Sequence, residues 1–358
     1  MRISFFILDI TTGGGIERAT AILSNVFAQK GHAVTIISAF RQNATPIFDL
    51  NKNISIVYFL NESYTHKRPI IYILIQYIKV IRALKSYYKK HPQDIIIGQA
   101  FLACFFLWIT GNNHNAYIGE HYKYDVYKKF IRIFRNYIYR TFRGIVALTS
   151  NDAERYHSHG LKATVIPNIA AFSTEHSCNH NVKRMISVGH LHPSKGYDLL
   201  LPALKPVFKK HPDWHIDIYG EGDDRQMLEK LRNDLGLNGH VNFPGFAYNI
   251  QKEYCNSAFY VMSSRYEGLP MVLLEAMSCG LPIVSFNCKE GPSTLLRNDA
   301  GYLVPPENIP AMSTAICQMI ENEQLRKSYA KKALEVIKDY SPETIYKKWI
   351  NLFESNDN

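Results

Sequence analysis

Short runs of apolar and β-branched residues alternate with longer helical patterns along this chain, and the whole pattern occurs twice. Alternating strands and helices are typical of parallel sheets that helices cover on both faces. In the first half, the clearest helical patterns are Ile16–Lys30 and Ile70–Lys90. The predicted strands of this half are Ile3–Asp9, Ala33–Ser38, Ile54–Phe59, Ile95–Gly98, Ala116–Ile118 and Gly144–Leu148.

The second half repeats this organisation, with predicted strands at Met185–Val188, His215–Tyr219, Val241–Phe243, Phe259–Met262, Pro282–Phe286 and Tyr302–Val304. The chain has 358 residues, beyond the size at which a single hydrophobic core usually keeps growing. We therefore predict two doubly wound, Rossmann-like α/β domains, at residues 1–168 and 169–340. The boundary falls within Pro167–Lys183, where polar residues replace the apolar rhythm. Such domains bind ligands at the carboxyl ends of their strands, so we expect a site in a central cleft that both face.

The positive charge of the chain is concentrated in its first half. Residues 1–170 contain 21 Lys and Arg against 9 Asp and Glu, whereas residues 171–358 contain 20 against 22. Basic residues lie among aromatic ones in Lys79–Lys90 and Lys123–Arg143, a combination that suits an anionic membrane surface. Solvated helix faces explain either stretch alone equally well. The asymmetry of the whole half favours a membrane, and nucleic acid is disfavoured because no nucleic-acid-binding motif accompanies the charge.

Other bulk features are typical of a cytoplasmic protein. The six cysteines form no C-x-x-C pair, which favours reduced thiols. The longest apolar runs, Pro69–Ile78 and Ala100–Thr110, are interrupted or too short to span a bilayer. The first apolar run stops at Asp9, as expected for a buried strand rather than a signal peptide.

Two glutamates stand out in the segment from Ser263 to Gly280. We expect a helix to begin at about Pro270, so that its free N–H groups and positive dipole end form a phosphate site. Glu267 precedes this helix on the loop. Glu275 lies inside it between apolar neighbours, where a carboxylate is costly to bury without a polar partner such as the hydroxyl pair of a ribose. A solvent-facing Glu275 is the alternative, and the apolar surroundings disfavour it.

Glu267 and Glu275 are separated by seven residues in the string E-G-L-P-M-V-L-L-E-A-M-S-C-G-L-P-I-V. This string resembles the E-x7-E signature of the family 4 retaining glycosyltransferases, which have the GT-B fold. Further matches follow in the family's order over nearly the full chain. They are the G-G-x-E-R loop at Gly13–Arg18, the P-N at Ile166–Asn168, the V-G-R-L…K-G stretch at Val188–Gly196, the G-x-G turn at Tyr219–Gly222 and the late loop at Glu290–Ser293. The resemblance also implies that the C-terminal helix, 341–358, packs back onto the N-terminal domain.

The resemblance implies a role for each matching residue of the donor site. Glu267 would be catalytic and contact the donor sugar, while Glu275 would bind the ribose hydroxyls. Lys195 would bind the diphosphate, whose charge a compact ammonium offsets. The remaining expected donor-binding residues are Gly14, Gly15, His190, Gly268 and Leu269. His190 replaces the usual arginine and pairs with phosphate only when protonated or as a single donor, which shifts charge neutralisation onto Lys195.

His121 follows a strand of the first domain in the string G-E-H-Y. It resembles a catalytic histidine that the family places near the acceptor and the donor sugar, and a packed core histidine is the alternative. The chain contains no D-x-D sequence and its other histidines suggest no metal constellation. We therefore expect a metal-independent enzyme without a cofactor.

The resemblance implies retaining transfer of a hexose or N-acetylhexosamine from a nucleotide diphosphate sugar, with UDP as the first choice. The loop Cys288–Ser293 resembles enzymes of lipopolysaccharide O-antigen, capsule or exopolysaccharide synthesis. This implies an undecaprenyl-diphosphate-linked saccharide acceptor, at the cytoplasmic face of the inner membrane. The alternatives are another GT-B nucleotide-sugar enzyme, such as an epimerase or a phosphorylase-like enzyme, and an inactive peripheral membrane protein. A nicotinamide-dependent dehydrogenase is disfavoured, because Arg18 stands where its third glycine would be.

Overall fold

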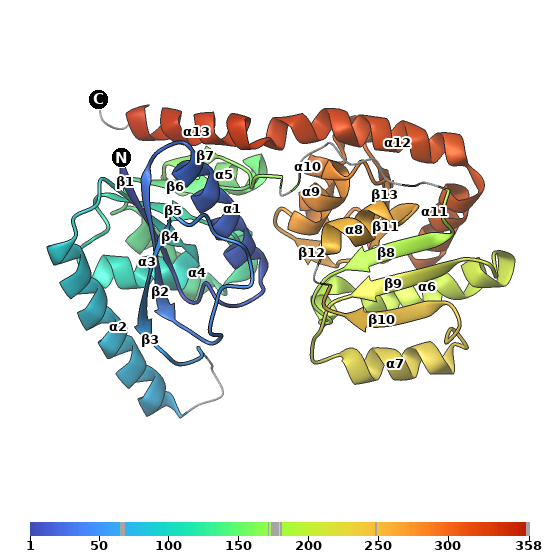
Figure 1. The fold of residues 1–358 in the computed structure, drawn as a ribbon, viewed down its shortest axis with the longest axis horizontal. Helices are drawn as coiled ribbons and strands as arrows, with labels where there is room; N and C mark the ends of the chain where they lie inside the picture. The colour runs from blue at the N-terminus through green and yellow to red at the C-terminus, as the bar shows by residue number, and fades with distance from the viewer. Residues whose placement is uncertain (65–68, 171, 173–178, 180, 248, 356–358) are drawn as a thin grey trace. The chain divides into compact units, whose positions relative to one another are not determined.

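The computed structural model describes residues 1–64, 69–170, 172, 179, 181–247 and 249–355. The chain forms two compact units (Figure 1). Unit 1 comprises Met1–Ile169 and Pro342–Asn358, and unit 2 comprises Ala170–Ser341. Cys178 and residues 356–358 of the expected C-terminal helix lie outside the described residues, as does part of the expected boundary stretch.

The sheet of unit 1 has seven parallel strands in the order β3-β2-β1-β4-β5-β6-β7. The strands are β1 Arg2–Ile7, β2 Ala33–Phe40, β3 Ser55–Leu60, β4 Ile95–Gln99, β5 Ala116–Gly119, β6 Gly144–Ala147 and β7 Ala163–Val165. Strands β4, β5 and β6 are buried along their full length, and β1 and β2 over most of theirs, which is why they read as nearly continuous apolar runs. The strand order changes direction between β1 and β4, and this switch point is where doubly wound sheets bind ligands.

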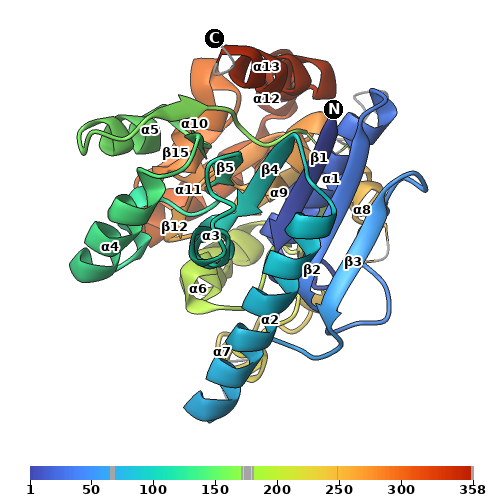
Figure 2. The ribbon, with the colours of Figure 1, turned by 90° about the vertical axis from the view of Figure 1, so that its left-hand side faces the viewer.

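Two layers of helices cover this sheet. One face packs against α1 (Gly15–Gln29) and the C-terminal helix α13 (Pro342–Ser355). Phe27 of α1 lies against Trp349 and Phe353 of α13, and the Tyr117 hydroxyl donates to the Leu352 carbonyl oxygen at 3.3 Å. The other face packs against the helices that Figure 2 shows beside the sheet: α2 (Ile70–Lys90), α3 (Ala100–Ile109), α4 (Lys129–Tyr139) and α5 (Ser150–His157).

The sheet of unit 2 has six parallel strands in the order β10-β9-β8-β11-β13-β15. The strands are β8 Arg184–Val188, β9 His215–Tyr219, β10 Val241–Gly245, β11 Phe259–Met262, β13 Ile283–Phe286 and β15 Tyr302–Val304. The helices are α6 Tyr197–Lys210, α7 Arg225–Asp234, α8 Ile250–Cys255, α9 Met271–Ser278, α10 Gly291–Leu295, α11 Ile309–Glu321 and α12 Glu323–Val336. In order along this unit, its strands are arranged 3-2-1-4-5-6, the arrangement of dinucleotide-binding folds.

The predicted fold class of two doubly wound α/β units is confirmed. The predictions missed β7, an edge strand of three residues, and the two-residue strands β12 (Tyr266–Glu267) and β14 (Lys289–Glu290), which pair with each other. Segments this short carry no periodicity that a sequence pattern can detect. Strand β1 ends before the predicted Asp9, because the Asp9 carboxylate accepts hydrogen bonds from the Thr11 amide and hydroxyl and so forms a turn.

Candidate active site

The switch point of unit 2 lies between β8 and β11, at the carboxyl ends of these parallel strands. The loop after β8 carries Lys195, and the loop after β11 carries Glu267. The Lys195 ammonium donates to Glu267 Oε1 at 2.6 Å, and the Ser264 hydroxyl donates to the same oxygen at 2.7 Å. The two charged side chains are 24% and 12% exposed. The fold therefore brings together the two residues that the sequence analysis assigned to the diphosphate and the sugar.

A close backbone contact holds Lys195 in this position. Gly196 has a φ of +65°, and a Cβ at this residue would overlap the carbonyl oxygen of Ser263. The Ser263 hydroxyl donates to the Lys195 carbonyl oxygen at 2.9 Å. Only glycine combines this left-handed backbone with so close an approach, which explains why the lysine is followed by glycine.

Arg265 ties the two loops together and was missed by the sequence analysis. Its guanidinium binds the Asp198 carboxylate through two hydrogen bonds of 2.8 and 2.7 Å and donates to the Pro193 carbonyl oxygen at 2.6 Å. Its backbone N–H donates to the Ser194 carbonyl oxygen at 2.9 Å. A two-pronged guanidinium–carboxylate pair is geometrically specific, so Arg265 is well suited to fix the Lys195 loop against the Glu267 loop.

Gly268 and Leu269 connect β12 to the start of α9, which begins at Met271 with Pro270 as its N-cap. A Cβ at Gly291 would overlap the Gly268 carbonyl oxygen, so the segment after β14 lies directly against this loop. Leu269 is buried and Gly268 half-buried. Helix α9 therefore begins immediately after the Glu267 loop, as expected, one residue later than the sequence predicted.

Glu275 is fully buried in α9. Its Oε2 accepts a hydrogen bond of 3.0 Å from the Tyr254 hydroxyl. The alternative of a solvent-facing glutamate is therefore wrong. The carboxylate has no exposed surface in this structure, so a ribose would reach it only after a shift of the residues that cover it.

His190 lies on the loop after β8 and is exposed. Its ring stacks on that of His192, with centroids 6.1 Å apart and an interplanar angle of 19°. The G-x-G turn supports this loop, because a Cβ at Gly220 would overlap the Gly189 carbonyl oxygen and one at Gly222 that of Leu191. The matching motifs at 188–196 and 219–222 are thus in direct contact.

In unit 1, Gly14 and Gly15 are exposed at the start of α1, where Gly14 is the N-cap. The Glu17 carboxylate occupies the space beside Gly14, where a Cβ would overlap its Oε2. Burial raises the pKa of Glu17. Hydrogen bonds from the backbone of Glu17 and Gly14 and from the Thr12 side chain lower it, but by less. The Glu17 carboxylate thus lies at the start of α1, where the sequence predicts that the donor phosphate binds.

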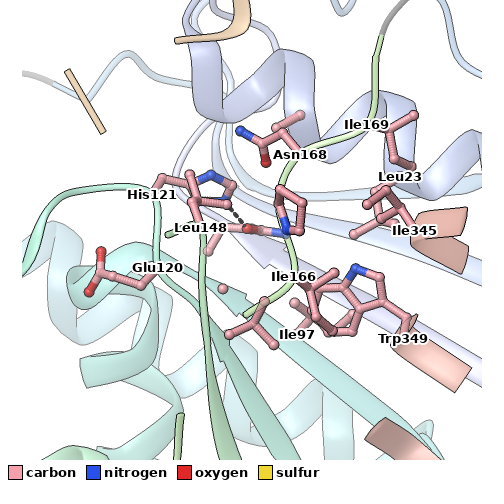
Figure 3. Close-up of a pocket in the computed structure, with 15 residues that line it drawn as sticks. Leu23, Ile97, Glu120, His121, Leu148, Ile166, Asn168, Ile169, Ile345 and Trp349 are labelled. Carbon is pink, nitrogen blue, oxygen red and sulfur yellow. Dashed lines mark hydrogen bonds between the residues drawn. The ribbon is translucent and has the colours of Figure 1, made fainter. Parts of the chain in front are cut away.

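His121 follows β5 and lines a pocket within unit 1 (Figure 3). Its Nε2 lies 2.5 Å from Gln99 Oε1, so Nε2 carries the hydrogen and Nδ1 is the acceptor nitrogen. Burial lowers the pKa of His121 to about 4, which keeps the ring neutral at pH 7. The pocket wall includes Asn168 together with Ile345 and Trp349 of α13. His121 is therefore a half-buried histidine with one face on a pocket, not a fully packed core residue.

Glu120 also lines this pocket, but its carboxylate points away from His121 (Figure 3). It accepts hydrogen bonds from the Tyr139 hydroxyl at 2.7 Å and the Tyr156 hydroxyl at 3.3 Å. Burial raises the pKa of Glu120, and the charge of the buried Arg135 acts in the opposite direction. These contacts anchor the segment that carries His121, which gives Glu120 a structural role.

Among the described residues, one group of three ligand-type side chains has its ligand atoms within 4.8 Å of one another: His211, Cys317 and Glu321. Glu321 pairs there with Lys210 at 2.5 Å. His211 directly follows α6, which starts at the carboxyl end of β8 and runs back along the sheet. This group therefore lies at the opposite edge of the sheet from Lys195 and Glu267.

Two family models match adjacent parts of the chain. The model described as "Glycosyltransferase Family 4" matches residues 13–170, and that described as "Glycosyl transferases group 1" matches residues 169–336. The chain belongs to the family 4 glycosyltransferases.

Three of the curated relatives match over almost the full length of both chains. An uncharacterized glycosyltransferase of Haemophilus influenzae is 29% identical over 357 residues, covering 97% of this chain and 98% of that protein. The amylovoran biosynthesis glycosyltransferase AmsD of Erwinia amylovora is 28% identical over 354 residues, covering 95% and 96%. A Campylobacter jejuni alpha-1,4-N-acetyl-D-galactosaminyltransferase, named for an undecaprenol-diphosphate-linked saccharide, is 26% identical over 364 residues, covering 98% of each. The chain is thus similar to glycosyltransferases of bacterial polysaccharide synthesis.

Solved structures share the fold at low identity. A variant of TarM from S. aureus, in complex with fondaparinux, alpha-GlcNAc-glycerol and UDP, has a TM-score of 0.81 at 18% identity, covering 99% of this chain and 100% of that one. The Anabaena protein HepE, in complex with UDP and glucose, has a TM-score of 0.79 at 17% identity, with coverage of 99% and 100%. These matches confirm the GT-B fold.

Proposed function

We propose that this chain is a retaining glycosyltransferase that moves a hexose or N-acetylhexosamine from a UDP-linked donor to a lipid-linked saccharide in cell-surface polysaccharide synthesis. The observation that carries the proposal is the Lys195–Glu267 pair at the switch point of unit 2. A cation and a carboxylate side by side at this edge match the two ends of a sugar diphosphate, which has charged phosphates and neutral hydroxyls.

In the proposed donor complex, Lys195 leaves Glu267 and binds the diphosphate, where its charge stabilises the leaving group. The backbone N–H groups of Gly268 and Leu269 and the start of α9 complete this anion site. The Glu267 carboxylate then accepts hydrogen bonds from the donor sugar, while Ser264 holds it in place. His190 adds a single donor nitrogen from the loop after β8.

Two further proposed contacts with the donor can form only after side chains in this structure move. Glu275 would bind the ribose hydroxyls once its carboxylate is uncovered. Gly14 and Gly15 would bring backbone N–H groups to the donor phosphate once the Glu17 carboxylate leaves the start of α1.

Retention follows if the acceptor hydroxyl attacks the anomeric carbon on the face from which the diphosphate departs. The C–O bond to the diphosphate breaks as the new glycosidic bond forms, and a phosphate oxygen takes the proton of the hydroxyl. No strong protein base is needed for this route. His121 enters as a neutral ring whose Nδ1 accepts a hydrogen bond from a sugar hydroxyl, while Gln99 holds Nε2.

The choice of donor and acceptor rests on similarity. UDP is bound in the TarM and HepE structures, and the name of the C. jejuni relative includes an undecaprenol-diphosphate-linked saccharide. No helix in the described part of the chain has both the length and the apolar character that crossing a bilayer requires. We propose an undecaprenyl-diphosphate-linked saccharide as acceptor and a peripheral position on the cytoplasmic, anionic face of the inner membrane.

The test is release of nucleotide from each UDP-hexose and UDP-N-acetylhexosamine in turn, with an undecaprenyl-diphosphate-linked oligosaccharide as acceptor. We expect one donor to dominate, the α configuration of the donor to persist in the product by NMR, and activity to survive excess EDTA. A product of inverted configuration would reject retention, and loss of activity that added Mg²⁺ restores would reject metal independence. If no donor yields acceptor-dependent release, the transferase proposal fails.

A further inference from the structure

Helix α4 of unit 1 exposes most of its apolar residues to the solvent. Phe130 is 85% exposed, Ile133 59% and Tyr137 61%, while Arg135 and Asn136 of the same helix are buried. A helix at the surface of a globular protein normally buries its apolar side and exposes its charges. Helix α4 buries Ile138 and Tyr139 in the core, but it buries Arg135 and Asn136 beside them and leaves a second apolar side in the solvent.

Specific contacts prevent α4 from rotating to bury these residues. The Arg135 guanidinium lies 4.6 Å from the ring centre of Tyr124 and 5.0 Å from that of Tyr156, and it donates to the Tyr124 carbonyl oxygen at 3.1 Å. The Asn136 amide donates to the Tyr124 hydroxyl at 2.7 Å. Cation–π contacts and buried hydrogen bonds of this kind are lost if the helix turns. The outward apolar side is therefore part of the folded state.

The first half of α2 also exposes apolar side chains. Ile70, Ile71 and Leu74 are 78%, 68% and 52% exposed, and Ile75 and Ile78 are also exposed. Helix α3 lies between α2 and α4, with Phe105 and Trp108 in ring contact with Phe134 of α4 and Phe106 in ring contact with Tyr77 of α2. Figure 2 shows the three helices on one side of the sheet. We call the exposed apolar residues of α2 and α4 the apolar face; they are Ile70, Ile71, Leu74, Ile75, Ile78, Phe130, Ile131, Ile133, Phe134 and Tyr137.

The charged residues of the two helices themselves are all basic. No acidic residue occurs between Glu62 and Asp94, or between Asp125 and Asp152, and these two stretches contain all of α2 and α4. Lys79 and Arg82 of α2, and Lys128, Lys129 and Arg140 at the ends of α4, are exposed. Two acidic side chains lie beside these helices: Asp125 is paired with Arg132 and Arg155, and Glu62 accepts hydrogen bonds from Tyr72 and Gln76 of α2. Exposed aliphatic and aromatic side chains with basic neighbours complement an anionic lipid surface.

The apolar face and the pocket both lie toward the carboxyl edge of the sheet of unit 1. Helices α2 and α4 follow β3 and β5, so both begin at the carboxyl edge of the sheet. Gln99 is the last residue of β4 and His121 follows β5, so both lie at this same edge. We propose that the apolar face inserts into the headgroup region of an anionic bilayer, so that the pocket edge of unit 1 lies at the lipid surface. This inference rests on the proposed function, for which it supplies the route by which a lipid-linked acceptor reaches the enzyme.

The experiment uses the full chain and vesicles of phosphatidylcholine with or without phosphatidylglycerol. We expect sedimentation with phosphatidylglycerol vesicles in low salt and much weaker binding to phosphatidylcholine alone. The double variant Phe130→Asp/Ile133→Asp should lower the partition coefficient about tenfold or more, because two inserting side chains become charged. The matched control is Phe246→Asp in unit 2, which alters a residue of similar exposure, 67%, and should bind as the unaltered chain does.

Circular dichroism and the thermal midpoint establish that both variants are folded. Nucleotide release with a detergent-solubilised acceptor separates this inference from the proposed function, because the double variant should keep that activity and lose activity on acceptor embedded in vesicles. Equal vesicle binding by the double variant and the unaltered chain would overturn the inference. So would a dimer that the double variant converts to monomer without any binding to lipid, since the apolar face would then bind a second copy of the chain.

Discussion

The Lys195 ammonium lies 2.6 Å from the Glu267 carboxylate, although the two residues are 72 positions apart in the chain. Each charge neutralises the other at a partly buried edge of unit 2. A ligand that takes Lys195 for its phosphates leaves Glu267 without its cation, and the carboxylate can then turn to the hydroxyls of a sugar. The pair thus couples diphosphate binding to sugar binding in the proposed mechanism.

Replacing each partner should separate these two steps. Glu267→Gln keeps the shape of the side chain and removes its charge, and we expect kcat to fall by about 100-fold or more while UDP affinity stays the same or rises, because Lys195 is released. Lys195→Met should instead weaken UDP binding about tenfold or more. Isothermal titration with UDP and turnover assays measure both effects. Unchanged turnover in Glu267→Gln would remove Glu267 from the mechanism.

Gly196 should be irreplaceable for two distinct reasons, backbone conformation and space. Gly196→Ala places a methyl group on a left-handed backbone and against the Ser263 carbonyl. Gly236→Ala is the matched control, since Gly236 has a φ of +73° with nothing within 4 Å of its Cβ position. The control should lose about 1–2 kcal/mol of stability, and Gly196→Ala should lose clearly more and also lower kcat by displacing Lys195. Thermal unfolding and turnover test this, and equal behaviour of the two variants would mean that the contact with Ser263 is unimportant.

The sequence predicts the fold well because strands buried on both faces are continuous apolar runs, and β4 and β11 were located to within a residue. It also predicts which loops meet, because parallel strands end at one edge. Pairings that depend on the exact path of a loop are not accessible in this way. The Arg265–Asp198 pair joins residues 67 apart, and neither belongs to a motif that would single it out.

The surroundings of the two buried or half-buried glutamates, Glu275 and Glu17, are also only partly predictable from the sequence. Apolar neighbours indicate correctly that Glu275 is inside the unit, yet the pattern does not identify Tyr254 as its hydrogen-bond partner. The G-G-x-E-R string likewise suggests a phosphate site at Gly14 and Gly15. In this structure the Glu17 carboxylate of that string lies beside Gly14, because a helix start attracts a nearby acid.

His121 should make the stability of unit 1 depend on pH. Its pKa is about 4 in the folded chain, against an ordinary value of about 6.5 when unfolded. The unfolded chain therefore takes up a proton between these values that the folded chain does not, and stability is lost as pH falls from 6.5 towards 4. In His121→Gln, which cannot titrate, the free energy of unfolding from denaturation curves should change less with pH across this range. A variant with the same slope as the unaltered chain would show that His121 does not carry this dependence.

Between pH 6.5 and 8, His121 is neutral in the folded chain, so its titration should not shape the rate of transfer. A neutral ring that accepts a hydrogen bond predicts that His121→Gln lowers kcat at every pH in this interval by a similar factor. A rate difference that grows or shrinks about tenfold across the interval would instead identify a titrating His121.

Glu275 and Tyr254 allow ribose recognition to be distinguished from internal packing. Tyr254→Phe removes the hydroxyl that donates to Glu275 and should cost about 1–3 kcal/mol of stability, because a buried carboxylate loses a hydrogen bond. If Glu275 binds ribose, Glu275→Gln should weaken UDP binding about tenfold without weakening inorganic diphosphate binding, since only UDP carries the ribose. Tyr254→Phe should leave both affinities close to those of the unaltered chain. Equal weakening of UDP and diphosphate by Glu275→Gln would assign Glu275 to the shape of α9 rather than to the nucleoside.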